Sequence, residues 1–331
     1  MKKIILYIIL ITILQGCLSN KSTRRYDEVA QENERLEALD RVMPYSIKVY
    51  AAATYKTINF DAEMQYTNAD LSTIHFQNFE PESSTESSMA TATIIKSNPD
   101  QNILLTCYHI FNYPDTVRQF YYRSDGSQTA FLRSVSVKTS QKNFTKQSGK
   151  SQDLNFIASD ENLDVAILAF ENPDQNSIPF SIETIEAESV RTGETVFVPG
   201  FPSGYKMVTK ATVSKPNRHK PETIMLDANF NRGFSGAPFY AYSARKKKML
   251  FAGIVTTAAS ETKNVLTPKY QSHQKIYDPA EPYKDAMYVE RDERVKYGVT
   301  FTVTTEKLND FYIHEKARFE EKSINLDPVF N

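Results

Sequence analysis

Short apolar runs separated by turn signals occupy most of this chain between residues 45 and 303, and they constrain its fold more than any other feature. Runs of this kind predict antiparallel strands. About a dozen of them, with no long helical pattern in between, predict an all-β sandwich or a pair of barrels. The expected strands are Ser46–Ala52, Ala90–Lys96, Asn102–Thr106, Phe131–Lys138, Val165–Phe170, Thr195–Pro199, Val208–Val213, Glu222–Leu226, Pro238–Tyr242, Met249–Thr256 and Tyr297–Val303.

Helical patterns flank the strand region on both sides. The first predicts an amphipathic helix, stopped by Pro44, whose apolar face contains Val29, Leu36, Leu39 and Met43. The second predicts a closing helix, capped by Thr305, with an apolar face of Leu308, Phe311, Tyr312 and Phe319. We expect the polar stretches at residues 66–88, 141–153 and 260–292 to be surface insertions.

The N-terminus has the pattern of an export signal. Lys2 and Lys3 precede an apolar run over 4–14, which is too short to span a bilayer but suits a signal peptide. The following Leu14-Gln15-Gly16-Cys17 resembles the bacterial lipobox, which implies cleavage before Cys17 and lipidation of its sulfur. We therefore expect a signal peptide over 1–16, a tether and helix over 17–43, and an exported, membrane-anchored lipoprotein. An ordinary signal peptide with a chance cysteine is the alternative.

The residue after Cys17 is Leu18 rather than Asp. By resemblance to Gram-negative sorting, this favours the outer membrane, facing either the periplasm or the surface. A Gram-positive source stays open as an alternative.

The composition excludes several classes of protein and partner. Hydrophobic residues make up 40% and charged residues 24%, as in an ordinary globular chain. The formal net charge of −1 gives no basic field for nucleic acid. If Cys17 is lipidated, Cys107 is the one remaining cysteine and no intramolecular disulfide is expected. No Cys, His and Asp residues show metal-ligand spacing, so we predict no metal and no cofactor.

Glycine is scarce, at 10 of 331 residues, and two of these glycines flank one serine. In Gly233-Phe234-Ser235-Gly236-Ala237-Pro238, the glycines allow a tight turn that exposes the Ser235 hydroxyl. Such a turn also aims two backbone N–H groups at one point, which suits a nucleophile with an oxyanion site. A glycine-rich hairpin turn with an idle serine is the alternative.

A histidine and an aspartate stand at the ends of two apolar strands upstream. The strand over 102–106 leads to His109, and Asp164 directly precedes the apolar run Val165–Phe170. Because an unpaired buried carboxylate is costly, Asp164 is expected to pair with a histidine N–H and fix its tautomer. Taken alone, His109 could be structural and Asp164 a loop residue. Asp160 is a weaker candidate for the carboxylate.

The chain order His109, Asp164, Ser235 differs from that of α/β-hydrolases and of subtilisins. It resembles that of trypsin-like serine peptidases, and the sequence looks most like their bacterial Deg (HtrA) branch. The resemblance runs from about residue 90 to residue 312. The segments that carry it are Leu105–Ile110, Asp164–Leu168, Val198–Gly204, Asp227–Gly236, Gly253–Val255 and Gly298–Phe301.

This resemblance implies a peptidase domain over 44–331, with two antiparallel six-stranded β-barrels, short terminal helices and a cleft between the barrels. It implies a serine endopeptidase that hydrolyses peptide bonds of proteins or peptides through an acyl-enzyme. His109 would be the base, Asp164 would orient it, and the N–H groups of Gly233 and Ser235 would form the oxyanion hole. The substrate pocket would be lined by Asn229, Phe230, Thr256, Thr257 and Ala258. That pocket has no carboxylate, so we expect small or medium apolar residues there rather than Lys or Arg.

Several features depart from the family pattern. Ala90-Thr91-Ala92-Thr93 replaces expected glycines, Arg232 stands where the Deg pattern has proline, and Phe234 stands where it has asparagine. A bulky Phe234 could narrow the cleft. No PDZ domain is expected after the last matching strand.

Two other functions remain open at this stage. One is a catalytically impaired trypsin-like lipoprotein that binds peptides or partners, and the other is a β-rich surface lipoprotein without this fold. Cys107 is interpreted as a small buried hydrophobe, with a reactive thiol as the alternative. Residues 245–248 are interpreted as a solvated hairpin turn, with an anion site as the alternative.

Overall fold

The computed structural model describes residues 28–123, 127–147, 149–171, 183–186, 189–214, 224–268 and 287–330. At 257–264, 267–268, 287–297, 328 and 330 it describes the backbone alone. The predicted signal peptide and Cys17 lie outside these ranges. Among the helices within them, none is long and apolar enough to cross a membrane.

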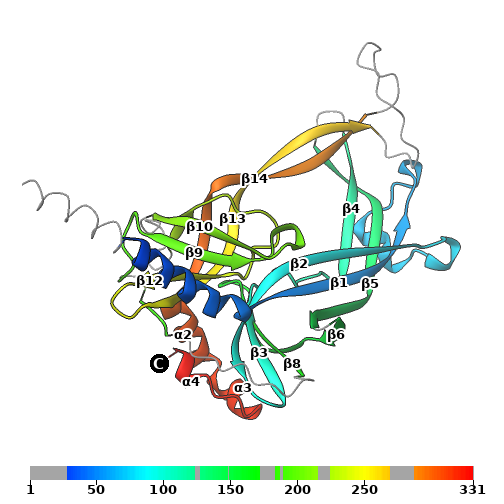
Figure 1. The fold of residues 1–331 in the computed structure, drawn as a ribbon. Coiled ribbons are helices and arrows are strands. Elements are labelled where there is room, and N and C mark those ends of the chain that lie inside the picture. The colour runs from blue at the N-terminus through cyan, green and yellow to red at the C-terminus, as the bar shows by residue number, and fades with distance from the viewer. Residues whose placement is uncertain are drawn as a thin grey trace, which may run out of the picture.

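The N-terminal half forms an antiparallel sheet (Figure 1). Its strands follow the order β4-β5-β1-β2-β3-β8-β7, with β6 paired to β5 outside this path. They are β1 (Ser46–Asn59), β2 (Glu82–Ser97), β3 (Gln101–Thr106), β4 (Thr116–Tyr122), β5 (Gln128–Gln147), β6 (Lys150–Asp153), β7 (Asn155–Asp160) and β8 (Val165–Glu171).

The C-terminal half forms a closed barrel in the order β10-β11-β14-β13-β12-β9. Its strands are β9 (Thr195–Gly200), β10 (Met207–Ser214), β11 (Met225–Asp227), β12 (Pro238–Ser243), β13 (Lys248–Pro268) and β14 (Met287–Thr304). Beyond the barrel, β13 and β14 continue as a long hairpin that pairs Ser260–Pro268 with Met287–Val295 and extends away from it (Figure 1).

The predicted all-β class and the six-stranded C-terminal barrel are confirmed, and each of the eleven expected strands overlaps an observed one. The N-terminal half differs from the expected six-stranded barrel. There β5 pairs with β1, β4 and β6, so the sheet has eight strands, and its path through the described residues ends at β4 and β7.

Parts of the expected insertions are strands. Residues 82–88 extend β2, residues 141–153 fall mostly in β5 and β6, and part of 260–292 forms the long hairpin. Exposed residues make up most of 82–88 and half of the described residues of 141–153. These strands are therefore held by ladder hydrogen bonds and lack the apolar alternation that sequence analysis relies on.

The helices at both ends of the chain pack into one core with the sheets. Residues 28–42 form a helix that ends before a 3-10 turn, η1 (Met43–Tyr45). Its buried residues are Ala38, Leu39 and Val42, whereas Val29 and Leu36 are exposed, so the predicted apolar face was wrong in part. Helical spacing alone did not identify the side that the barrel covers, where Arg35 lies over the Phe197 ring.

The closing helices are α2 (Thr305–His314), α3 (Lys316–Glu321) and α4 (Asp327–Phe330). Leu308, Phe311, Tyr312 and Phe319 are buried as predicted. Thr304, not Thr305, is the N-cap residue, and the Thr305 hydroxyl donates to the Ile185 carbonyl. The remaining 3-10 turns are η2 (Ala62–Met64), η3 (Asn68–Ser72), η4 (Phe76–Asn78) and η6 (Pro202–Gly204).

Candidate active site

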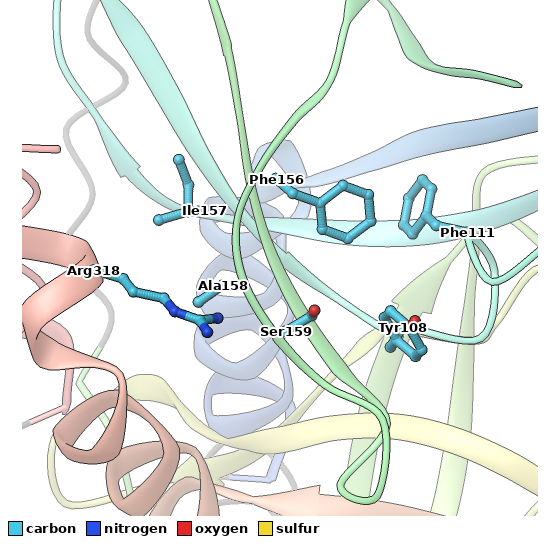
Figure 2. A pocket seen from close by; sticks show the side chains of 7 residues that line it. All are labelled: Tyr108, Phe111, Phe156, Ile157, Ala158, Ser159 and Arg318. Carbon is cyan, nitrogen blue, oxygen red and sulfur yellow. The ribbon is translucent and has the colours of Figure 1, made fainter. Parts of the chain in front are cut away.

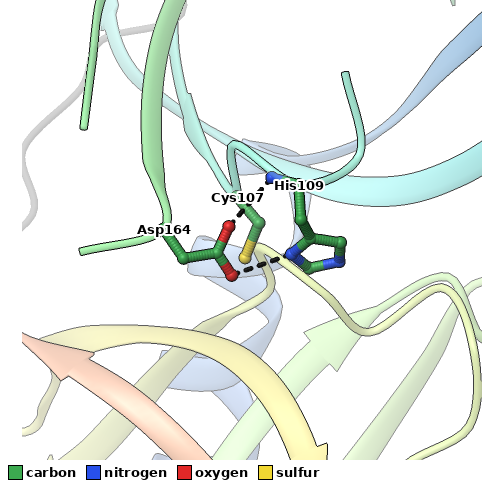
Figure 3. Close-up of side chains that lie close together, drawn as sticks. All are labelled: Cys107, His109 and Asp164. Carbon is green, nitrogen blue, oxygen red and sulfur yellow. Dashed lines mark hydrogen bonds and ion pairs between the residues drawn. The ribbon is translucent and has the colours of Figure 1, made fainter. Parts of the chain in front are cut away.

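His109 follows the buried strand β3 and faces Asp164 (Figure 3). Its ring Nδ1 lies 2.8 Å from Oδ2 of Asp164, and its backbone N–H donates to Oδ1 at 2.9 Å. A carboxylate can only accept hydrogen bonds, so Nδ1 carries the proton and Nε2 of the neutral ring has a free lone pair. Two bonds to one carboxylate thus fix the tautomer and the orientation of the imidazole.

Asp164 is placed by the tight turn between β7 and β8. Its φ of 59° lies in the left-handed region, which aspartate tolerates better than most residues. Asp160 shapes the same turn, because its Oδ1 accepts the Leu163 N–H at 2.9 Å. The two acidic residues are therefore distinguished: Asp160 caps the turn, and Asp164 presents its carboxylate to His109.

The site is partly open to solvent. The His109 side chain is 41% exposed and the Asp164 side chain 19%. The carboxylate is thus shielded while the imidazole remains accessible to another molecule.

Every backbone carbonyl from Arg232 to Ser235 accepts a hydrogen bond. In chain order, the donors are the Ser203 N–H at 3.0 Å, the Thr91 hydroxyl at 2.6 Å, the Ala237 N–H at 2.8 Å and the Thr91 N–H at 3.0 Å. The orientation of each peptide group around Ser235 is therefore fixed by a partner.

The N–H groups of this loop behave differently. The N–H of Phe234 donates to Asn231 at 3.2 Å, and that of Gly236 donates to Val255 at 2.7 Å. Across the part of the chain that the structure describes, nothing accepts from the N–H groups of Gly233 and Ser235. Because N–H and C=O point opposite ways in a trans peptide, both groups are turned away from the partners of the preceding carbonyls. The unpaired groups are the two that the sequence predicts for the oxyanion hole.

Two glycines are required by this packing. A Cβ on Gly236, which has φ +77°, would lie 2.2 Å from the Thr106 hydroxyl and 2.3 Å from the Thr91 carbonyl. A Cβ on Gly233, at φ +109°, would lie 2.3 Å from the Phe201 carbonyl. At Gly236 the loop therefore lies against the end of β3, which leads to His109, and at Gly233 it lies against the turn at Phe201, both at distances that only glycine permits.

The Ser235 hydroxyl does not complete the chain of hydrogen bonds. Both residues lie in described ranges, and no hydrogen bond joins Ser235 to the His109 imidazole. The structure thus brings His109 and Asp164 together and packs the Ser235 loop beside them, at Gly236, without the serine–histidine bond. Such bonds are often long in structures without a substrate.

Cys107 lies beneath this pair and is fully buried. Its thiol donates to the Val255 carbonyl over 3.3 Å. Burial, followed by the negative charge of Asp164, raises the pKa of the Cys107 thiol well above its usual range. The prediction that Cys107 is a small buried group is confirmed in its burial.

Cys107, His109 and Asp164 place ligand atoms within 4.8 Å of one another, which the sequence spacing did not reveal. A metal needs the thiolate of a cysteine, and the raised pKa opposes its formation. The imidazole Nδ1 and the carboxylate are also already bonded to each other. The arrangement therefore fits an oriented base better than a metal centre.

The predicted substrate pocket is not assembled as expected. Phe230 is buried at 4% exposure and packs edge-on against Phe234, with ring centroids 4.8 Å apart, inside the barrel core. Thr256 is buried and donates to Phe301, and Asn229 is exposed. The ring of Phe230 lies among the buried residues of the barrel core, and its role in a substrate pocket stays a prediction. The side chains of Thr257 and Ala258 lie outside the described atoms.

Phe234 is buried in the barrel core. Its ring is 2% exposed, and a Cβ on Gly200 would lie 2.7 Å from it. The large residue next to Ser235 in the chain therefore packs into the barrel core and anchors the loop from inside.

A pocket of about 290 Å³ is lined by Tyr108 and Phe111, which stand on either side of His109 in the chain, and by residues of β7 and α3 (Figure 2). Phe111 and Phe156 meet edge-on in it, with ring centroids 5.5 Å apart. Tyr108 and Arg318 line its ends, and the Arg318 guanidinium is paired with Glu315 at 3.0 Å. None of the residues predicted to bind substrate contributes to it.

Residues 90–245 match the family model of the trypsin-like peptidase domain. This range contains His109, Asp164 and Ser235. The peptidase domain predicted from the ordered motifs is therefore supported by an independent comparison. No protein of curated function matches the chain in sequence.

Solved structures of proteases are also similar to this chain. The active form of the Rv3671c protease from M. tuberculosis shares 16% identity and a TM-score of 0.41, over 83% of this chain and 82% of that one. The inactive form gives 14% identity and a TM-score of 0.41, over 84% and 91%. A serine endoprotease from Yersinia pestis gives 14% identity and a TM-score of 0.43, over 85% of this chain and 66% of that one.

The basic run at residues 245–248 lies at the turn between β12 and β13 of the C-terminal barrel. Lys246 and Lys248 bond the Glu183 carboxylate at 2.6 and 2.7 Å and lower its pKa to about 2. Lys247 bonds Glu34 at 2.5 Å. The hairpin-turn interpretation is confirmed, and three of its charges hold neighbouring segments.

Sequence analysis missed one residue of the site. Thr91 was noted as a departure from the expected glycines, yet it contacts the Ser235 loop through both its side chain and its backbone. No sequence signal separates it from Thr93, which is equally buried in the same strand but has an unbonded hydroxyl among the described atoms.

Proposed function

We propose that this protein is a serine endopeptidase of the Deg type that cleaves proteins or peptides through His109, Asp164 and Ser235. The observation that carries the proposal is the pattern of backbone hydrogen bonds in the loop around Ser235. Its carbonyls are all engaged, and the N–H groups of Gly233 and Ser235 are left without an acceptor in the described chain. The Nδ1–carboxylate bond of His109 supports it.

The chemistry follows from these contacts. Nε2 of His109 takes the proton from the Ser235 hydroxyl as its oxygen attacks the substrate carbonyl. The N–H groups of Gly233 and Ser235 stabilise the oxyanion that forms. The imidazolium, stabilised by Asp164, then protonates the leaving amine. Water hydrolyses the acyl-enzyme by the same route, which restores the serine.

Labelling with a fluorophosphonate probe tests this function directly, because the probe forms a covalent bond with an activated serine. We expect the wild-type protein to be labelled and Ser235→Ala and His109→Ala to remain unlabelled. Ser151→Ala is the matched control, since Ser151 is an exposed residue of β6. Labelling that persists in Ser235→Ala would exclude Ser235 as the nucleophile.

The missing bond between Ser235 and His109 favours a second candidate, a peptide-binding protein with an impaired site. The same experiment separates the two functions. A folded wild-type protein that is never labelled, and that binds an unfolded polypeptide without cleaving it, supports the binding module. Labelling that depends on Ser235 and His109 excludes it.

We also propose that the chain is an exported lipoprotein, cleaved before Cys17 and anchored through acyl chains on that residue. The run over 1–16 and the small residue before Cys17 support this proposal. Metabolic labelling with palmitate should be lost in Cys17→Ala and retained in Cys107→Ala. The second variant is a matched control, because these are the two cysteines of the chain. Label that survives in Cys17→Ala would contradict the anchor.

A further inference from the structure

Thr91 joins the N-terminal sheet to the loop that carries Ser235. It lies in β2, is fully buried, and has no place in the proposed mechanism. We infer that Thr91 is a positioning residue that sets the geometry of the oxyanion hole through its side-chain hydroxyl. This role rests on the proposed peptidase function, to which it adds a residue that acts through the loop.

The hydroxyl of Thr91 is saturated by two backbone groups from different segments. It donates to the Gly233 carbonyl over 2.6 Å and accepts the Phe201 N–H over 3.0 Å. A hydroxyl offers one donor, and this donor is committed to the peptide group between the two oxyanion N–H groups. The Thr91 side chain therefore fixes the orientation of the peptide between Gly233 and Phe234 through its carbonyl oxygen.

The backbone of Thr91 holds the same loop at a second point. Its N–H donates to the Ser235 carbonyl at 3.0 Å, and its own carbonyl accepts the Thr106 hydroxyl at 2.8 Å. Thr106 is the last residue of the strand that leads to His109. Thr91 thus lies between the strand that delivers the base and the loop that delivers the nucleophile.

The hydrogen bond from the Phe201 N–H to the Thr91 hydroxyl links Thr91 to a second turn. Phe201 begins the turn in which the Ser203 N–H holds the Arg232 carbonyl at 3.0 Å. That carbonyl belongs to the peptide whose N–H is on Gly233. One hydroxyl therefore connects the Gly233 carbonyl with the turn that orients the Gly233 N–H. Removing the Thr91 hydroxyl would loosen both peptide groups of Gly233, the one that contains its N–H and the one that contains its carbonyl.

Thr93 provides a control within the same strand. It is also fully buried, but its hydroxyl has no hydrogen-bond partner among the described atoms. Replacing either threonine by valine keeps the shape of the side chain and replaces a hydroxyl by a methyl group. The two changes differ in whether a bonded hydroxyl is lost.

The test compares Thr91→Val, Thr91→Ser and Thr93→Val by the kinetics of fluorophosphonate labelling. We expect Thr91→Val to lower the maximal rate of inactivation about tenfold or more, with the probe concentration for half-maximal rate unchanged, since the oxyanion contact acts in the transition state. Thr91→Ser, which keeps the hydroxyl, should restore most of the rate. Thr93→Val should match the wild type. A rate for Thr91→Val within twofold of the wild type, or an equal loss in Thr91→Ser, would overturn the inference.

Amide hydrogen exchange gives a readout that does not need activity. Exchange over residues 231–236 should be faster in Thr91→Val than in Thr93→Val, while exchange over β8 stays the same. Equal exchange over 231–236 in these two variants would overturn the role of the hydroxyl. If the wild type is not labelled but exchange differs, the proposed peptidase function fails and the anchoring contact of Thr91 stands.

Discussion

The backbone N–H and the ring Nδ1 of His109 bond to different oxygens of the Asp164 carboxylate, at 2.9 and 2.8 Å. A single side chain thereby fixes the position of the histidine along the chain and the direction of its ring. The lone pair on Nε2 is left for a third group.

Asp164→Asn should abolish most activity without unfolding the protein. Asparagine tolerates the left-handed backbone at this position, but its amide can donate to Nδ1 and so stabilise the wrong tautomer. We expect the labelling rate to fall about a thousandfold or more. Asp160→Asn is the control, because its side-chain oxygen can still accept the Leu163 N–H. A rate for Asp164→Asn within tenfold of the wild type contradicts the assigned role.

Gly236→Ala should destabilise the protein far more than Gly149→Ala. The two glycines have nearly equal positive φ angles, +77° and +79°, so the backbone strain of alanine is matched. A Cβ at 149 meets nothing within 4 Å, whereas one at 236 overlaps the Thr91 carbonyl. By urea unfolding, we expect Gly149→Ala to cost about 1 kcal/mol and Gly236→Ala at least ~2 kcal/mol more. Similar costs would mean that the loop does not lie against β2.

Phe234→Ala should lower the free energy of unfolding by about 3–5 kcal/mol, because it leaves a cavity in the barrel core. The exposed Phe76 is the control, and Phe76→Ala should change stability by less than about 0.5 kcal/mol. Denaturant unfolding of both variants measures the difference. A loss below about 1 kcal/mol for Phe234→Ala would place its ring in the cleft instead of the core.

Cys107 makes stability depend on pH in the alkaline range. Its pKa is raised in the folded state, so below its ordinary value of 9.0 the thiol is protonated in both states and its contribution is constant. Above that pH the unfolded chain loses the proton first, and the free energy of unfolding falls by up to ~1.4 kcal/mol per pH unit. Cys107→Ala should lack this component, which the difference between the two unfolding curves between pH 8.5 and 10 would measure. Parallel curves would refute the prediction.

The strand pattern and the ordered motifs were enough to predict the fold class, the barrel and the pairing of His109 with Asp164. Strands such as β8 are fully apolar, and their ends position the residues that follow. Strands such as β4, β6 and β7 were missed, because exposed and polar residues break their alternation. Their formation depends on partners far away in the chain.

The directions in which side chains point could not be predicted from the sequence either. Phe230 and Phe234 stand next to the nucleophile in the chain, and their distance in sequence suggested a pocket and a narrowed cleft. The barrel interior instead takes both rings. Thr91 was read as a missing glycine, since the groups that bond it come from residues more than a hundred positions away.

The packing of the N-terminal helix has a consequence for where this protein can act. The helix is described from residue 28, and Glu34 and Arg35 already bind the C-terminal barrel, through Lys247 and Phe197. Between Cys17 and this helix there are ten residues, which can reach at most about 35 Å when fully extended. If Cys17 is lipidated as proposed, residue 28 would be held within this distance of the lipid surface, with the folded domain beyond it. The proposed peptidase would then reach only proteins that come close to the same membrane.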